Sequence, residues 1–280
     1  MEKSLRRSFA IFVLPTLLAF TLCFIVPFVM GIGLSFSRFT TVTNATFAGM
    51  ANYRQAFADS TFLYSLGFTS LFAAVMLVIV NVCAFALAGL LTRGLKGTNV
   101  ARTIFFLPNL IGGIVLGYIW QLIINGVLLH YDAAINLHVK YGFWGLVILT
   151  SWQMIGYMMI IYIAGMMTIP GDLLEAAAID GADGRQRLFH IILPLMMPAI
   201  TICSFLTLVG GYKLFDQNLA LTAGEPARAT EMLALNIYNT FYGRVGFEGV
   251  GQAKAVVFFI IVAAISLIQL HFTRRKEMQQ

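Results

Sequence analysis

The chain has 280 residues, of which 59% are hydrophobic and only 11% are charged. A soluble domain of ordinary composition has about 45–50% apolar and about 25% charged residues, so these values exclude a typical water-soluble globule. The mean hydropathy of +0.85 also indicates an integral membrane protein. The formal net charge of +6 does not indicate nucleic-acid binding, because the cations flank apolar segments instead of gathering on one face or arm.

Six runs without Asp, Glu, Lys or Arg divide the chain into candidate membrane spans. They cover residues 8–37, 60–92, 103–131, 141–171, 188–212 and 255–273. About 20 apolar residues in a helix cross a hydrocarbon core of roughly 30 Å, and a backbone in lipid must satisfy its own hydrogen bonds. The stretch from Leu71 to Val82 lacks the alternation of a membrane β-strand. We therefore predict an all-α, polytopic membrane protein with six transmembrane helices.

The positions of Lys and Arg predict how the spans are oriented. Eleven of the eighteen lie at the two chain ends or in the loops around 93–102 and 185–187, and seven lie on the opposite side. Because cations concentrate on the cytoplasmic side of a membrane protein, both termini are expected in the cytoplasm. The first apolar run continues to Ser37, beyond the 7–15 residues of a secretory signal, so it is interpreted as a retained span.

Nothing in the sequence predicts a metal ion or a cofactor bound by this chain. Cys23, Cys83 and Cys203 fall inside apolar runs, which favours packing over a disulfide or a metal site. The four histidines are scattered, at positions 130, 138, 190 and 271, so they are interpreted as loop and interface residues.

The inner loop between the fourth and fifth runs contains the signals of a short helix of about three turns. Pro170 suits its first position, and the acidic side chains of Asp172 and Glu175 suit the positive end of the helix dipole. Gly181 suits a left-handed residue just beyond the end of the helix.

One face of this predicted helix carries small apolar side chains. Leu174, Ala177 and Ala178 are spaced i, i+3 and i+4, so they share a narrow stripe that another surface can approach closely. The stripe indicates docking on the cytoplasmic side. A helical hairpin that only connects two spans is the alternative interpretation.

On the opposite side, residues 213–254 form a long loop with the signals of a short amphipathic helix. Thr230 suits its N-cap, apolar residues recur at every fourth position from Leu233 to Phe241, and Gly243 suits its end. An ordinary ordered loop is the alternative.

The inner loop also resembles the EAA loop of bacterial ABC importer permeases. The resemblance is carried by Glu175-Ala-Ala, Gly181, Ile191, Leu193 and Pro194. Within it, the sequence from Asp180 to Ala182, together with Phe189, is similar to the version found in carbohydrate importers. Charge counting independently predicts that this loop is cytoplasmic, where an ATPase would meet it.

Other parts of the chain extend the resemblance. They are Phe47 to Tyr53, Arg102 to Pro108 with Trp120, Leu221 to Pro226, and Arg274 to Glu277. These stretches favour the half-permease that resembles the maltose-F and glycerol-phosphate-A type over its usual partner half. Two departures occur: Glu225 stands where the family has glycine, and Gly67 to Thr69 replaces the usual Asn-Thr pair.

The resemblance implies the transmembrane domain of a type I ABC importer in a bacterial cytoplasmic (inner) membrane. The implied partners are a second homologous permease subunit, two cytoplasmic ATPase subunits, an extracellular sugar-binding protein and membrane lipid. ATP and Mg would be bound by the ATPase subunits. This chain is expected to be no enzyme, because its nearest approach to a phosphate-binding loop, Gly89 to Lys96, has Leu95 in the lysine position.

The same resemblance assigns regions and coupling residues. Residues 1–60 would form an N-terminal tail, the first span and an extracellular loop, and 274–280 a cytoplasmic tail. Residues 61–273 would form the transport domain, with its EAA coupling loop at 169–194 and its extracellular loop at 213–254. The predicted ATPase-coupling residues are Leu174, Glu175, Ala176, Ala177, Asp180 and Gly181.

Sugars are held by amides, hydroxyls and aromatic faces, so such residues inside spans are candidates for the substrate path. Gln153 and Tyr157 share one face of the fourth span, and the resemblance places Tyr157 at a position that contacts sugar in the maltose system. The fifth span adds Gly210, Gly211 and Phe215, and the missing side chains of the two glycines leave room there. The alternative roles are membrane-interface anchoring for aromatic residues and close helix packing for glycine.

The main rival function is an ion-coupled secondary carrier. Such a carrier ordinarily has carboxylates inside its spans, and none of the six runs contains one. A channel or an intramembrane enzyme would show a charged pore ring or a catalytic constellation, and neither is visible. Monosaccharides, oligosaccharides and glycerol phosphate all stay open as substrates, and the uncharged spans favour a neutral sugar over a phosphate ester, which prefers cationic ligands.

Overall fold

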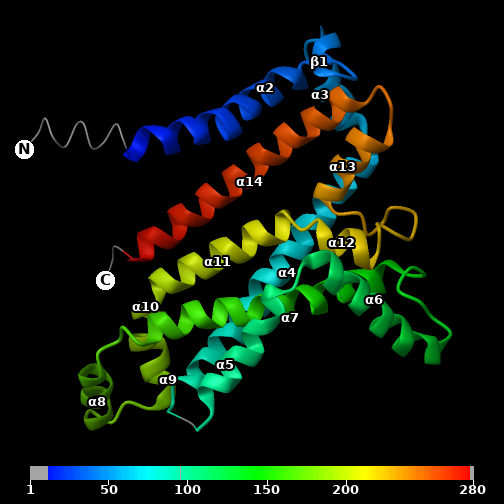
Figure 1. The fold of residues 1–280 in the computed structure, drawn as a ribbon. Coiled ribbons are helices and arrows are strands. Elements are labelled where there is room, and N and C mark those ends of the chain that lie inside the picture. Colours follow the sequence, from blue (N-terminus) through cyan, green and yellow to red (C-terminus); the bar gives the residue numbers. More distant parts are fainter. Residues whose placement is uncertain (1–11, 95, 278–280) are drawn as a thin grey trace, which may run out of the picture. The chain divides into compact units, whose positions relative to one another are not determined.

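The computed structural model describes residues 12–94 and 96–277 (Figure 1). The predicted basic N-terminus and Leu95 lie outside the described residues, as do the side chains of Arg274–Glu277. The described chain is predominantly helical, with one short antiparallel pair of strands, β1 (Ser37–Arg38) and β2 (Thr46–Phe47). It forms two compact units: residues 12–60 with 237–260, and residues 61–236 with 261–277.

The prediction of six transmembrane helices is confirmed when one bent pair of helices is counted as a single span. Within the described residues, five helices are long and apolar enough to cross a membrane: Phe12–Ser35, Ser60–Leu91, Gly113–Tyr131, Val139–Met166 and Glu248–Thr273. The sixth span is the pair Gly184–Leu195 and Met197–Tyr212, which bends by 71°. Pro198 contributes to this bend, because it has no N–H to donate to the carbonyl of Pro194.

In the first unit, the short helix α3 (Ala51–Ala58) is fixed to the end of the span helix α2 (Val26–Ser35). The Asn52 amide donates hydrogen bonds to the carbonyls of Ser35 (2.9 Å) and Ser37 (2.8 Å). The Ser35 hydroxyl also lies 2.7 Å from the Tyr53 hydroxyl. These bonds satisfy the backbone where the chain turns out of the span.

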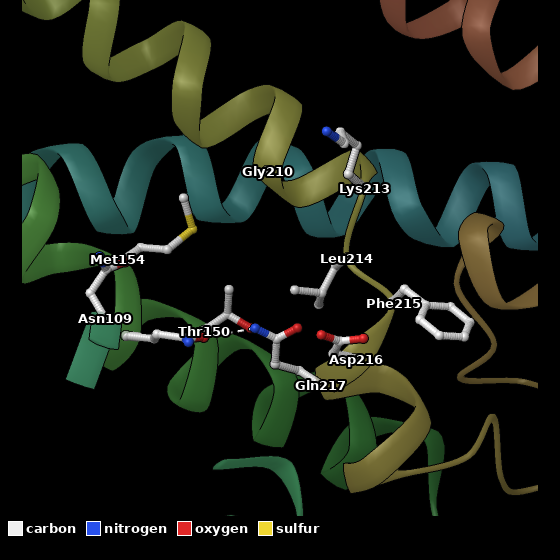
Figure 2. A pocket seen from close by; sticks show the side chains of 10 residues that line it. Asn109, Thr150, Met154, Gly210, Lys213, Leu214, Phe215, Asp216 and Gln217 are labelled. Carbon is white, nitrogen blue, oxygen red and sulfur yellow. Dashed lines mark hydrogen bonds between the residues drawn. The ribbon is translucent and has the colours of Figure 1, made fainter. Parts of the chain in front are cut away.

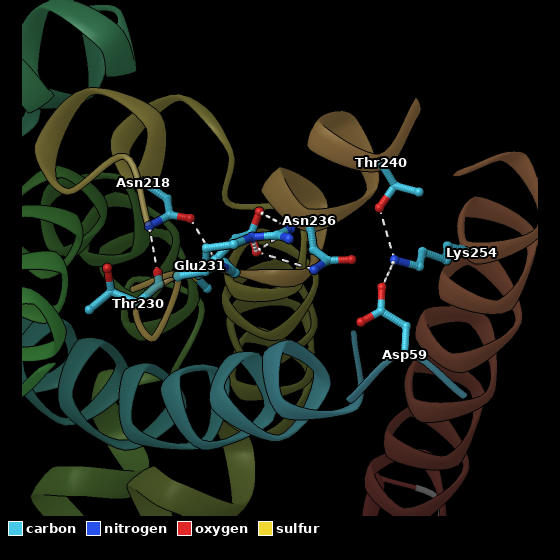
Figure 3. A network of polar contacts seen from close by, with 9 residues as sticks. Asp59, Asn218, Thr230, Glu231, Asn236, Thr240 and Lys254 are labelled. Carbon is cyan, nitrogen blue, oxygen red and sulfur yellow. Dashed lines mark hydrogen bonds and ion pairs between the residues drawn. The ribbon is translucent and has the colours of Figure 1, made fainter. Parts of the chain in front are cut away.

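The last helix of the chain, α14 (Glu248–Glu277), begins seven residues earlier than the predicted run at 255–273. The predicted run begins after Lys254 because charged residues are treated as boundaries. Lys254 is fully buried instead, and its ammonium donates to Asp59 Oδ2 (2.7 Å) and Thr240 Oγ1 (2.8 Å) (Figure 3). Thr240 lies on α13 (Leu233–Gly243). A buried ammonium is tolerated when it is paired in this way.

The second unit is built around three long helices: α4 (Ser60–Leu91), α7 (Val139–Met166) and α11 (Met197–Tyr212). Its buried core includes Met76 and Val80 from α4 and Leu149 from α7. A polar link crosses the same core: the Tyr162 hydroxyl donates to Asn81 Oδ1 (2.7 Å), and the Asn81 amide donates to Thr207 Oγ1 (3.3 Å). Side-chain hydrogen bonds of this kind hold helices together in lipid.

The three cysteines are free. Cys203 is buried in the core of the second unit, as expected of a packing residue, whereas Cys23 and Cys83 are exposed. Packing is therefore the wrong prediction for the latter two. Their apolar neighbours in sequence lie on helices whose outer faces are also exposed, so apolar sequence context alone did not separate the two cases.

The third predicted run, 103–131, is wrong as one continuous helix. The structure has α5 (Thr98–Phe106), a 3-10 segment (Leu107–Leu110) and then α6 (Gly113–Leu128), and only Gly113–Tyr131 qualifies as a span. Pro108 and the glycines that follow it interrupt the α-helical hydrogen bonds. A rule based on charge alone does not detect this break.

The segment around this break packs unusually closely on α7. A Cβ atom at Gly156 would lie 1.8 Å from the carbonyl oxygen of Phe105, so only glycine fits there without a backbone shift. Because Gly156 has no side chain, the backbone of α5 can lie directly against α7.

We predict that Gly156→Ala destabilises the protein by about 1–3 kcal/mol, the usual cost of overpacking. Gly67→Ala is the matched control, because Gly67 is also helical and its added Cβ would meet nothing within 4 Å. The measurement is the midpoint of thermal unfolding of the detergent-purified protein with its co-purifying subunits. Equal midpoints for the two variants would contradict the close approach of α5 to α7.

Candidate functional site

The helix of the predicted EAA loop is α8 (Gly171–Ile179), and Gly181 ends it as predicted. Gly181 has φ +79°, its N–H donates to the Ala178 carbonyl (3.2 Å), and the Ala182 N–H donates to the Ala177 carbonyl (2.9 Å). This pair of bonds is a Schellman motif, which requires a left-handed residue. The start differs from the prediction: Pro170 is the extended N-cap residue, so the helix has nine residues, about two and a half turns.

No residue of α8 is buried within this chain. Leu174 and Ala177 are half-buried, whereas Ala178 is exposed, so the stripe predicted from spacing is divided between two faces. The more open face carries Leu173, which is 47% exposed, and Ile179, which is 87% exposed. Apolar side chains left this open on a short loop helix form a surface suited to contact with another protein.

Glu175, Ala176 and Asp180 are also exposed on this helix. The chain then turns into α9 (Gly184–Arg187) through a complete capping box. The Gln186 N–H donates to Asp183 Oδ1 (2.7 Å), and the Asp183 N–H donates to Gln186 Oε1 (2.7 Å). The inner loop therefore has fixed helix ends on both sides of Gly181.

Beyond α9 the chain continues through a π-helical segment (Leu188–Ile192) and α10 (Leu193–Leu195) into α11. The exposed apolar surface of the loop extends to Phe189, which is 58% exposed. The loop 169–194 is thus joined by helical segments to a long helix of the core.

At the other end of α11, a cavity of about 350 Å³ opens within the second unit (Figure 2). It is lined by Asn109, Thr150, Gln153, Met154, Gly210, Lys213, Leu214, Phe215, Asp216 and Gln217. The lining comes from the 3-10 segment, from α7, from the end of α11 and from the short helix α12 (Asp216–Leu221). No single stretch of the sequence forms this site.

Gln153 holds a central position in the cavity wall. Its amide donates to the Ile111 carbonyl (3.0 Å) and accepts a hydrogen bond from Gln217 Nε2 (2.7 Å). This pair links α7 to the broken third span and to α12. Two amides joined in this way still have free donor and acceptor positions for a hydroxylated ligand.

Two of the five residues predicted for the substrate path do not line the cavity, and the three that do are Gln153, Gly210 and Phe215. Gly211 is buried, and its added Cβ would lie 3.2 Å from Ala73, so it serves the close approach of α11 to α4. Tyr157 is 38% exposed and is not part of the lining.

Sequence reasoning missed several polar residues of the lining. Asn109, Thr150 and Gln217 were not considered, and Lys213 and Asp216 were not assigned to the path. Asn109 follows Pro108 in the unrecognised break, which is the one local signal that marks it. The others are brought to the cavity only by packing.

The outer loop contains the predicted helix as α13, which ends at Gly243. Thr230 is not its N-cap, because the helix begins at Leu233 and the Thr230 hydroxyl donates to the Glu225 carbonyl (2.6 Å). The Asn218 side chain ties this loop to α12: its amide donates to the Thr230 carbonyl (2.8 Å), and its oxygen accepts from the Met232 N–H (2.9 Å) (Figure 3).

Within this loop Glu231 is almost fully buried, and it pairs with Arg228 at 2.8 Å. Asn236 also donates to the Glu231 carboxylate (3.2 Å) (Figure 3). Among the described residues, no group of three His, Cys, Asp or Glu is placed to hold a metal ion. The buried carboxylate is therefore a structural anchor of the loop.

Comparison with known proteins identifies the family. Residues 93–278 match the family described as binding-protein-dependent transport system inner membrane component. The chain is 44% identical, over 96% of its length and 94% of the relative's, to the probable starch degradation products transport system permease protein AmyD of Thermoanaerobacterium thermosulfurigenes. The chain belongs to this family of inner membrane transport components. The resemblance to ABC importer permeases is thereby confirmed.

Further relatives of this inner membrane component agree with this family assignment. The chain is 29% identical, over 91% of both chains, to the multiple sugar-binding transport system permease protein MsmF of Streptococcus mutans. It is also 29% identical to the sn-glycerol-3-phosphate transport system permease protein UgpA of Brucella abortus, over 83% of this chain and 82% of that one. A bacterial ABC transporter that imports the acidic polysaccharide alginate shares its fold, with a TM-score of 0.82, 20% identity and 98% coverage of both chains.

For this inner membrane component, we predict that Gly181→Ala loosens α8. Of Gly181 and Gly184, only Gly181 has a left-handed φ, so alanine at position 181 is strained by about 1–2 kcal/mol. Gly184→Ala is the matched control, because both glycines lie in the same loop with nothing within 4 Å of the added Cβ. Hydrogen exchange of residues 171–183 should become faster only in Gly181→Ala. Equal exchange in the two variants would show that the left-handed turn does not hold the helix end.

Proposed function

We propose that this chain is a permease subunit of an ATP-driven sugar importer, and that it forms half of the translocation pathway. The names of the relatives AmyD and MsmF support a sugar substrate. The observation that carries the coupling role is α8, a short helix with a fixed C-terminal end and exposed apolar side chains in a loop predicted to be cytoplasmic. In this proposal, α8 binds a cytoplasmic ATPase subunit.

The coupling residues take different parts in this contact. Leu174 and Ala177 are half-buried, and they are the two residues of α8 that are not exposed. Glu175 and Ala176 are exposed and meet the ATPase, where a small alanine allows close approach. Asp180 and Gly181 end the helix and set the direction of the following segment.

The connection from α8 to the cavity suggests how the movement is transmitted. The loop leads through the bent pair into α11, whose 16 residues span about 24 Å at 1.5 Å per residue. The far end of α11 contributes Gly210 to the cavity wall, and Lys213 follows it directly. A displacement of the inner loop thus changes the packing around the cavity, which alternates between the two sides of the membrane.

The proposed assembly contains a second homologous permease subunit, two ATPase subunits and an extracellular sugar-binding protein. ATP and Mg are bound by the ATPase subunits, and this chain provides no hydrolytic site. The assembly lies in a bacterial cytoplasmic membrane, and both termini of this chain are in the cytoplasm. The structure of an alginate ABC transporter with its periplasmic protein supports this kind of organisation.

We predict that Ala176→Trp abolishes coupling, with at least a tenfold loss of sugar uptake, because a bulky side chain blocks close contact with the ATPase. Ala176→Ser, which keeps the small size, should transport normally. Since Ala176 is exposed, both variants should reach the membrane at equal levels. Uptake and substrate-stimulated ATP hydrolysis of the assembled complex in proteoliposomes are measured. Full uptake by Ala176→Trp, or uptake by the lone chain driven by an ion gradient, would contradict the proposal.

We predict that Gln153→Leu lowers sugar uptake by about fivefold, the effect of losing one hydrogen bond to the substrate. Gln121→Leu is the matched control, because Gln121 also donates to a backbone carbonyl, that of Leu221 (2.9 Å), but does not line the cavity. The assay uses the sugar that most stimulates ATP hydrolysis by the complex. An equal loss in both variants would remove the cavity from the substrate path.

A further inference from the structure

Two charged residues line the cavity, and their side chains point in different directions. Asp216 and Lys213 both line the cavity and are exposed, and no ion pair of either is present among the described residues. In Figure 2 the Asp216 carboxylate lies next to the side chains of Leu214 and Gln217, whereas the Lys213 ammonium points away from them. Of the two charged groups in the lining, the carboxylate is therefore the one directed toward the other side chains of the cavity.

The remaining polar groups of the cavity are neutral. Thr150 is 1% exposed, and its buried hydroxyl has no hydrogen-bond partner in the described chain. A buried hydroxyl without a partner is costly, so a ligand that supplies one would be stabilised. The amides of Gln153, Gln217 and Asn109 complete a lining that both donates and accepts hydrogen bonds.

We infer that the cavity selects uncharged, polyhydroxylated ligands, and that Asp216 is the residue that excludes anions. This inference rests on the proposed function, in which the cavity is part of the sugar path. Ligand hydroxyls donate to the Asp216 carboxylate, whereas a phosphate or a uronate is repelled by it. Anionic groups are held by Arg or Lys side chains directed at them, and the ammonium of Lys213, the cation of this lining, points away from the other lining side chains in Figure 2.

The chemistry of this cavity therefore differs from what the names of some similar proteins describe. Relatives are named for sn-glycerol-3-phosphate, and the structural neighbour imports an acidic polysaccharide. Both of those ligands are anionic. For this chain, the position of Asp216 predicts a neutral sugar or oligosaccharide.

The local charge can be measured without knowing the ligand. Cys23, Cys83 and Cys203 are replaced by serine or alanine, and Met154→Cys places a thiol in the cavity wall. The assembled complex is treated with trimethylammonioethyl methanethiosulfonate, a cation, or with sulfonatoethyl methanethiosulfonate, an anion. The ratio of the two labelling rates, cation over anion, reports the charge that a solute meets in the cavity.

The ratio should favour the cation and should fall by about 16-fold in Asp216→Asn. A unit charge about 5 Å away in water-like surroundings changes each rate by about fourfold, in opposite directions. Asp216→Glu should keep the ratio, and Lys213→Gln should change it by less than twofold. These two variants separate the carboxylate's charge from effects on folding and from the neighbouring ammonium.

A ratio that does not respond to Asp216→Asn, or that favours the anion, would overturn this inference and leave the result for Gln153→Leu intact. Asn109→Cys provides a second reporter in the same wall. If neither thiol is labelled by either reagent, aqueous solutes do not enter the cavity, and both this inference and the cavity's place in the proposed path are wrong.

Discussion

The structure depends on one constraint: in hydrocarbon, every backbone polar group and every charge must find a partner within the protein or leave the membrane. The long helices satisfy their own backbone, and α3 shows how the chain leaves a span with Asn52 bonding the freed carbonyls. Lys254 shows the cost of an exception, since its buried ammonium is held by Asp59 and Thr240. Polar groups that have no such partner therefore mark places where water, a ligand or another subunit enters.

Two regions of the second unit carry the proposed function, the first by this criterion and the second by its exposed apolar side chains. One is the cavity, where the Thr150 hydroxyl is buried without a partner beside the linked amides of Gln153 and Gln217. The other is α8, whose apolar side chains Leu173 and Ile179 stay exposed although the C-terminal end of the helix is fixed at Gly181. Because α11 extends from the inner loop to the cavity, a single bent element connects them. The proposed function follows from this connection and from the family to which the chain belongs.

The sequence predicted the features that depend on neighbouring residues. Charge-free runs located the spans, and Gly181 was recognised as the left-handed end of a helix from its local pattern. It did not predict features that require distant partners. Lys254 was treated as a boundary because Asp59, 195 residues away, neutralises it only in the folded chain. The cavity lining was found in part, since Gln153 lies inside a span, whereas Asp216 reaches the site only through the packing of α12.

The central claim is that α8 is a cytoplasmic contact for an ATPase subunit. It is tested most directly by replacing Ala176 with a photoreactive amino acid and irradiating bacterial membranes that contain the assembled complex. The account predicts a covalent adduct with the nucleotide-hydrolysing subunit, and none from the same probe at Val245, which is 90% exposed in the loop expected outside. An adduct with that subunit from Val245 and none from Ala176 would contradict the account.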